Sequence, residues 1–250
     1  MNATTIHAAP SKRRTPLPSH RKTSLTAGAL YLLTFISIPT LFLYNQVKTD
    51  PNFVAGTGGD ALVVLGGVLE VIVALACIGT AVALYPVIKR HNEGIALGFV
   101  AARTLEAATI FAGVVALMSI VTLRQLGAGE EALAAGQALL AQHTWTTLLG
   151  QGLIPAFNAL LLGSLMFRSR LLPRALPVVG LIGAPLLIVG AVGVMFGLWG
   201  PVNPVSGIAA LCLAVWEFGM GLWLVIKGFN PAAIATLDTM TASDKTSSSK

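Results

Sequence analysis

The chain has 250 residues, of which 55% are hydrophobic and only 10% are charged, and its mean hydropathy is +0.79. Soluble domains carry about a quarter charged residues, so this composition excludes an ordinary soluble domain. The formal net charge of +6 does not indicate nucleic-acid binding, because the basic residues gather at the ends of apolar runs rather than in one patch.

Residues 1–24 are basic, rich in Ser, Thr and Pro, and contain no acidic residue. A cleavable secretory signal would have a shorter apolar core followed by a small-residue cleavage site. Here the apolar run is about twenty residues long and exits through Leu43-Tyr44-Asn45-Gln46. We therefore expect an uncleaved first span, preceded by a disordered cytoplasmic tail over residues 1–24.

Six apolar runs are long enough to cross a bilayer, which takes about twenty residues. They cover about residues 25–44, 61–86, 95–122, 144–167, 178–199 and 205–226. Lipid offers no hydrogen-bond partner to exposed backbone groups, so these spans are predicted to be helices. The sequence thus predicts an all-α fold, a polytopic membrane helix bundle that occupies residues 25–227 as one domain.

Basic residues mark alternate ends of the spans. Those on one side are Lys12, Arg13, Arg14, Arg21, Lys22, Lys89, Arg90, Arg168, Arg170, Arg174 and Lys227. The loops on the other side hold only Lys48 and Arg124. This alternation follows the positive-inside rule and predicts that the N- and C-termini are both cytoplasmic.

The outer loop at residues 123–143 is rich in alanine, with Leu133, Leu139 and Leu140 at helical spacing. This pattern favours a short helix on the outer membrane surface, and a lid over an outward-facing pocket, formed by residues 127–143, is the alternative. At the other end of the chain, residues 228–250 finish in TASDKTSSSK. Such a polar segment predicts a disordered cytoplasmic tail.

Small residues and prolines predict how the spans pack. Small residues recur on one face of the second span (Gly66, Ala74, Cys77, Ala81) and of the sixth (Ser206, Ala210, Ala214, Gly221). Such stripes let membrane helices approach closely. Prolines inside spans, which are expected to kink them, are Pro39, Pro155 and Pro185.

Four ionisable residues lie inside the spans: Glu70, Arg103, Glu106 and Glu217. A charge at the centre of a membrane helix costs about 2.5–3.5 kcal/mol, so four unpaired charges would cost on the order of 10 kcal/mol. A rise of about 1.5 Å per residue along each span puts all four near the midplane, where they could meet.

The faces of the helices favour a single cluster. Arg103 and Glu106, three residues apart, project from one side of the third span. Glu70 and Glu217 lie within the small-residue stripes, and the fourth span offers Gln151 and Asn158 on one face. We therefore expect a buried polar centre that joins the second, third, fourth and sixth spans.

One arginine cannot neutralise three glutamates, so at least one carboxyl is expected to hold its proton. Such a centre suits a site that binds or moves a small solute. The alternative is a non-catalytic scaffold or regulator that holds partner membrane proteins. In that case the polar centre would only fix helix packing.

Enzyme chemistry is not indicated. The four histidines, at positions 7, 20, 91 and 143, lie in tails or at span boundaries, which excludes paired haem ligands within the membrane. The chain has no H-E-x-x-H motif, no phosphate-binding Walker sequence and no paired aspartates in a span. We expect no cofactor, no metal and no nucleic acid. The expected partners are the lipid bilayer, a small-molecule ligand or another membrane protein.

Two motifs resemble a known family. They are ARTLEA at residues 102–107 and WEFGMGLWLVIKGF at residues 216–229. A six-span protein with these motifs resembles the family called domain of unknown function 4386, and the likeness covers about residues 22–230. Arg103, Glu106 and Glu217 belong to the shared motifs, whereas Glu70 and the long N-terminal tail do not. The resemblance implies a bacterial inner-membrane protein and implies no activity.

Overall fold

The computed structural model describes residues 18–56 and 59–247, and within these residues every regular element is a helix. The α-helices are α1 (Pro18–Leu33), α2 (Thr40–Leu43), α3 (Asn45–Thr49), α4 (Asp60–Ile88), α5 (Glu93–Gln125), α6 (Leu133–Thr147), α7 (Ile154–Ser169), α8 (Ala175–Met195), α9 (Pro204–Ile226) and α10 (Pro231–Ser247). Two 3-10 turns, Thr34–Ser37 and Gly129–Ala132, and a π-helical segment, Leu148–Leu153, connect some of them. Residues 1–17 and 248–250, which belong to the predicted tails, lie outside the described residues.

Six helical stretches of the described chain are long and apolar enough to cross a membrane, which confirms the predicted number. They are His20–Leu43, Asp60–Ile88, Glu93–Gln125, Gly129–Ser169, Ala175–Met195 and Pro204–Ile226. The third and fourth contain 33 and 41 residues. At about 1.5 Å per residue, even the shorter of the two is about 50 Å long, whereas the hydrocarbon core is about 30 Å thick. Both therefore extend past the bilayer.

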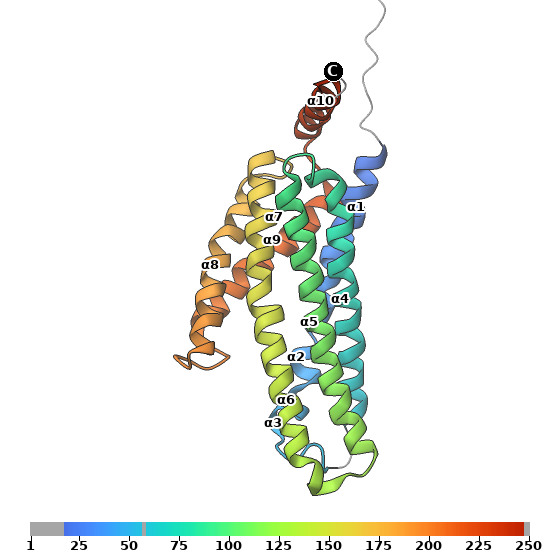
Figure 1. The fold of residues 1–250 in the computed structure, drawn as a ribbon, viewed down its shortest axis with the longest axis vertical. Coiled ribbons are helices and arrows are strands. Elements are labelled where there is room, and N and C mark those ends of the chain that lie inside the picture. Colours follow the sequence, from blue (N-terminus) through green and yellow to red (C-terminus); the bar gives the residue numbers. More distant parts are fainter. Residues whose placement is uncertain (1–17, 57–58, 248–250) are drawn as a thin grey trace, which may run out of the picture.

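The six long helices pack in a closed ring that follows their order in the chain. α4 lies between α1 and α5, α7 lies between α5 and α8, and α9 lies between α8 and α1. Figure 1 shows α4 and α5 side by side along most of their length. Side chains that point inward from different helices can therefore meet along the axis of the ring.

Small residues make the helix contacts close, as the sequence predicts. A Cβ atom at Gly28 of α1 would lie only 2.7 Å from the carbonyl oxygen of Gly221 in α9, so only glycine fits there. On α4, Ala74, Cys77 and Ala81 are at most 1% exposed. The small-residue stripe of the second span is thus used for packing within this chain.

The start of α1 is fastened to the end of α9. Arg21 donates hydrogen bonds to the backbone oxygens of Leu224 (3.3 Å), Val225 (2.7 Å) and Ile226 (3.4 Å). The last carbonyl groups of a helix have no partner within the helix, so Arg21 caps α9. The start of the first span and the end of the last span therefore lie at the same end of the bundle, and Figure 1 shows α10 at this end as well.

The structure departs from the predicted tails. α1 begins at Pro18, inside the segment assigned to the N-terminal tail, and α10 occupies most of residues 228–250. The side-chain oxygen of Asn230 accepts the backbone N–H of the second residue of α10 at 3.1 Å, which caps the helix. Leu237 is 3% exposed, and Asp238 pairs with Arg90 at 2.5 Å. Capping and packing together explain a helix in a polar segment.

The predicted surface helix in the outer loop is instead the first part of the fourth long stretch. α6 packs against α5 and runs through the π-helical segment directly into α7. No proline occurs between residues 129 and 153 to separate them. Pro155, which lacks a backbone N–H, follows the π-helical segment.

The other two prolines act differently from each other. The first span loses α-helical geometry after Leu33, passes through the 3-10 turn and resumes α-helix just after Pro39. Pro185 lies inside α8 without ending it. The predicted distortion is therefore present at Pro39, whereas α8 continues through its proline.

Candidate functional site

Arg103 lies at the centre of the ring with 1% of its side-chain surface exposed. Its Nη1 donates to Oε2 of Glu106 at 2.9 Å, and its Nη2 donates to Oε1 of Glu217 at 3.0 Å. Arg103 is thus paired with two glutamates, one on its own helix and one on α9. Hydrogen bonds between ionised groups are about twice as strong as neutral ones, so α5 and α9 are joined here by a strong contact.

The pair within α5 follows directly from helix geometry. Arg103 and Glu106 are three residues apart, which places their side chains on one face of the helix. α5 is a regular helix there, and its first turn is capped by Asn92, whose side chain accepts the N–H of Ile95 at 2.9 Å. The second carboxyl partner of Arg103, Glu217, lies on a different helix, α9, so this pair depends on how the helices pack.

Arg103 also contacts three side chains that the sequence analysis did not assign to the centre. Its guanidinium carbon lies 4.8 Å from the ring centroid of Tyr31 in α1 and 6.0 Å from that of Phe99. Its Nη1 lies 3.5 Å from Sγ of Cys77 in α4. Cation–π contacts of this kind favour a buried guanidinium. The sequence analysis did not include the first span in the polar centre, whereas the structure shows that Tyr31 of this span contacts Arg103.

Asn158 of α7 completes what we call the central cluster, which consists of Arg103, Glu106, Glu217 and Asn158. Nδ2 of Asn158 donates to Oε2 of Glu106 at 2.6 Å. Two buried polar atoms of the cluster, Nε of Arg103 and Oδ1 of Asn158, have no hydrogen-bond partner in the described residues. Buried polar groups are nearly always partnered, so this donor and this acceptor are available to a water molecule or a ligand.

The central cluster contains two carboxyl groups and one guanidinium group. If both carboxyls are ionised, the cluster carries a formal charge of −1. The side chains of Glu106 and Glu217 are 8% and 21% exposed, whereas that of Arg103 is 1% exposed. The two carboxyl side chains are therefore the part of the ion-paired cluster that the helices cover least completely.

Glu70 and Gln151 do not join the central cluster, contrary to the prediction of a single centre. Gln151 donates to Oε1 of Glu70 at 3.4 Å, and the hydroxyl of Tyr44 donates to Oε2 at 3.1 Å. On α4, Glu70 lies seven residues before Cys77, the residue that contacts Arg103. Seven residues correspond to about 10 Å along a helix, so Glu70 lies at a different depth from the central cluster.

His143 lies beside this second cluster of Glu70, Tyr44 and Gln151. It is 2% exposed, its Nδ1 is 3.3 Å from the carbonyl oxygen of Gly113, and its ring meets the Tyr44 ring edge-on at 5.6 Å. Its Nε2 has no partner among the described residues. The sequence placed His143 at a span boundary, and its burial follows from the unexpected packing of α6 on α5.

Lys48 brings a positive charge near the second cluster. Burial lowers the pKa of its ammonium group, and the negative charge of Glu70 opposes this shift. Its Nζ lies 5.5 Å from the centroid of the Tyr44 ring.

In the part of the chain that the structure describes, no three metal-ligating side chains lie together in a group that could hold a metal ion.

The fold and the buried pairs define a class of protein: a multispan α-helical membrane protein with buried Arg/Glu salt bridges. The family described as "Domain of unknown function (DUF4386)" matches residues 26–228. Because the match covers most of the chain, the protein belongs to this family, as its two motifs indicated. No curated protein and no solved structure matches the chain.

Proposed function

We propose that the central cluster binds a small polar solute together with one exchangeable proton. The observation that carries the proposal is that two carboxyl groups share one guanidinium, at 2.9 and 3.0 Å. A net charge buried in a low-dielectric interior is costly, so such a group of residues is driven to take up a proton or a cation. Ionisable residues in membrane spans commonly mark the paths of substrates and protons.

Two further features support a ligand at this place. The side chain of Glu217 is 21% exposed, so the surrounding helices of this chain do not cover the cluster completely. Nε of Arg103 can donate a hydrogen bond and Oδ1 of Asn158 can accept one, and neither does so within the described residues. An acceptor atom of a solute or a water molecule would satisfy the first of these atoms, and a donor would satisfy the second.

A retained ligand provides the test. The full-length protein would be purified in mild detergent, and native mass spectrometry would compare wild type with Glu217→Gln and with Glu131→Gln, an exposed control outside the cluster. We expect wild type and Glu131→Gln to retain a small molecule that Glu217→Gln loses, with all three folded. Equal retention in all three variants would place the ligand elsewhere, and no retention in any of them would count against a binding site.

A second candidate function is a scaffold or regulator for other membrane proteins, with a cluster that serves only to fix helix packing. The observation in its favour is that Arg103 is 1% exposed and both of its Nη atoms are bound to glutamates. Buried polar contacts can specify how membrane helices pack. In that case the cluster retains no ligand, and the protein instead copurifies with a membrane-protein partner.

We also propose the placement of the protein: one membrane domain over residues 25–227 in the bacterial inner membrane, with both termini in the cytoplasm. The alternation of basic residues between the two sides supports this orientation. Reporters fused after residues 48, 91, 127, 171 and 202 should alternate between the two sides, starting outside. Two successive fusions on one side would contradict the proposed topology.

A further inference from the structure

The connection between α8 and α9, residues 196–203, carries no charged residue, and we call it the α8–α9 tip. Its sequence is FGLWGPVN, and no Asp, Glu, Lys, Arg or His occurs anywhere in residues 175–216. The other two connections at this end of the bundle do carry charged residues, which are Lys48, Asp50, Glu130 and Glu131. The α8–α9 tip therefore differs in composition from the connections beside it.

The side chains of the α8–α9 tip are apolar and largely uncovered. Phe196 is 78% exposed, Leu198 is 70% exposed and Val202 is 98% exposed. This apolar surface continues onto exposed side chains of the two helices, at Val189 of α8 and Ile208 of α9. Both helices are long and apolar enough to cross a membrane, and apolar surface is favoured outside water. The tip is thus continuous with the lipid-facing surface of α8 and α9.

At the end of α8, polar groups find partners within the protein. Gly197, with φ of 69°, adopts the left-handed conformation that commonly follows a helix. The N–H of Leu198 donates to the carbonyl oxygen of Gly193 at 2.9 Å. The indole Nε1 of Trp199 donates to the carbonyl oxygen of Gly190 at 3.0 Å, so the polar atom of this side chain turns back onto α8. These groups therefore need no partner from water.

The start of α9 is arranged in the same way. The side-chain oxygen of Asn203 accepts the backbone N–H of Ser206 at 2.8 Å, and its Nδ2 donates to the carbonyl oxygen of Gly200 at 3.0 Å. Pro201 and Pro204 have no backbone N–H to satisfy. Lipid offers no hydrogen-bond partner to backbone groups. A connection that supplies these partners itself is therefore suited to apolar surroundings.

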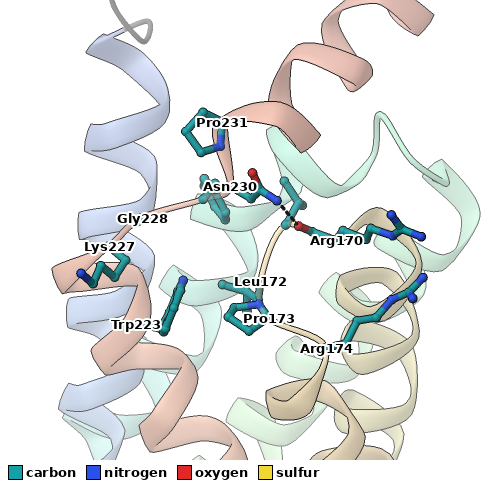
Figure 2. Close-up of a pocket in the computed structure, with 11 residues that line it drawn as sticks. Arg170, Leu172, Pro173, Arg174, Trp223, Lys227, Gly228, Asn230 and Pro231 are labelled. Atoms are coloured by element: carbon teal, nitrogen blue, oxygen red, sulfur yellow. Dashed lines mark hydrogen bonds between the residues drawn. The ribbon is translucent and has the colours of Figure 1, made fainter.

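The opposite end of the α8–α9 hairpin is cationic. Arg170 and Arg174 lie just before α8, and Lys227 follows α9. Figure 2 shows the charged groups of Arg170 and Arg174 on one side of this end and that of Lys227 on the other, directed away from the cavity between them. Basic side chains gather in this way where spans leave the membrane. This end of the hairpin therefore marks one surface of the bilayer.

From that surface, α8 does not reach past the hydrocarbon core. Its 21 residues rise about 32 Å, which a usual tilt of about 20° reduces to about the thickness of the core, roughly 30 Å. The 33 residues of α5 rise about 50 Å. Figure 1 accordingly shows the α8–α9 connection part-way along the bundle, with α5 and α6 continuing past it. The connection between α5 and α6 can therefore reach water where the tip does not.

From these observations we propose that the α8–α9 tip packs among the acyl chains of the leaflet opposite the basic span ends, with Phe196, Leu198 and Val202 in contact with lipid. The absence of charge, the internally bonded polar groups and the length of α8 favour lipid over water. Continuity with the lipid-facing surface of α8 and α9 favours lipid over a protein partner or a second copy of this chain. The proposal does not involve the central cluster and does not depend on the function proposed for it.

Spin labels read by electron paramagnetic resonance test the surroundings of the tip. A nitroxide would be attached to Val202→Cys in full-length protein that carries Cys212→Ala, because Cys77 is 1% exposed and stays unlabelled. The matched controls are Val189→Cys, on the lipid-facing side of α8, and Glu131→Cys, in the connection between α5 and α6. In vesicles of dioleoylphosphatidylcholine, collisions of each label with oxygen, which concentrates in lipid, are compared with its collisions with a water-soluble nickel chelate.

At Val202, as at Val189, we expect collisions with oxygen to exceed those with the nickel chelate, and we expect the reverse at Glu131. Phe196→Cys, at the other end of the tip, should behave like Val202→Cys. Collisions mainly with nickel at either tip position would place the tip in water and overturn the proposal. Rare collisions with both reagents would show that protein covers the tip, and this result would overturn the proposal as well.

Discussion

Replacing Arg103 with leucine removes the only cation of the central cluster and leaves Glu106 and Glu217 facing each other without a counterion. The wild-type guanidinium is 1% exposed and bonds to both carboxyls, at 2.9 and 3.0 Å. Breaking a buried ion pair by removing one partner typically costs about 3–5 kcal/mol. Because Glu217 is 21% exposed and can regain some solvation, we expect a loss near the lower end of this range.

The loss should depend on pH. In Arg103→Leu the folded protein is favoured when Glu106 and Glu217 are protonated, so the folded state binds more protons than the unfolded state. Stability then falls as pH rises, and the difference from wild type should be larger at pH 8 than at pH 5. For a chain of this size, about 3 kcal/mol corresponds to roughly 6–12 °C in the thermal midpoint.

Thermal melts in detergent from pH 5 to 8 would measure this effect in wild type, Arg103→Leu and Arg103→Lys. Lysine should rescue only part of the loss, because an ammonium group cannot present the planar fork that binds two carboxylates. Arg168→Leu, at an exposed position, serves as the control. If Arg103→Leu melts like wild type at every pH, the arginine is not paired in the core and the account of the central cluster fails.

Three further predictions test individual contacts within the bundle, each by thermal or chemical unfolding. Gly28→Leu should destabilise by about 1–3 kcal/mol or more, because its side chain would meet the backbone of α9. Asn158→Leu removes the 2.6 Å hydrogen bond to Glu106 and should cost about 1–3 kcal/mol. For Arg90 and Asp238, whose side chains are 30% and 39% exposed, a double-mutant cycle should give a coupling energy of at most about 1 kcal/mol.

Each of these variants has an outcome that contradicts its reasoning. Gly207→Leu is the control for the glycine, because nothing lies within 4 Å of that position, and equal effects of the two would refute a close contact at Gly28. If Asn158→Leu unfolds like wild type, Glu106 needs no hydrogen-bond donor from α7. A coupling energy well above about 1 kcal/mol would mean that the Arg90–Asp238 pair is shielded from water.

The features that sequence predicts well are those fixed by local spacing. The three-residue separation of Arg103 and Glu106 determines their shared helix face, and the six apolar runs determine the number of spans. The pairing with Glu217 follows from depth and charge, because it is a carboxyl near the level of Arg103 in another span.

The features that sequence misses depend on where long helices actually begin and end. α4 starts at Asp60, and Glu70 lies about two turns from the residue that contacts Arg103, so depths counted from apolar runs were too coarse to separate the two clusters. One hydrogen-bond partner of Glu70 is the hydroxyl of Tyr44, which follows the 3-10 turn that interrupts the first span. The start of α10 had a local signal, the Asn230–Pro231 pair, which is typical of a helix N-terminus.

In the proposed state of the central cluster, the carboxyl groups of Glu106 and Glu217 share one proton beside the guanidinium of Arg103. Infrared spectroscopy of the C=O stretch of protonated carboxyls at pH 7 tests it directly, because exposed Asp and Glu, which titrate near pH 4, are ionised there. We predict a protonated-carboxyl band in wild type that loses the same intensity in Glu106→Gln and in Glu217→Gln, since either change leaves one carboxylate paired with Arg103, whereas any contribution of the buried Glu70 stays the same in both variants. A wild-type spectrum without this band, or a band that persists unchanged in both variants, would contradict the claim.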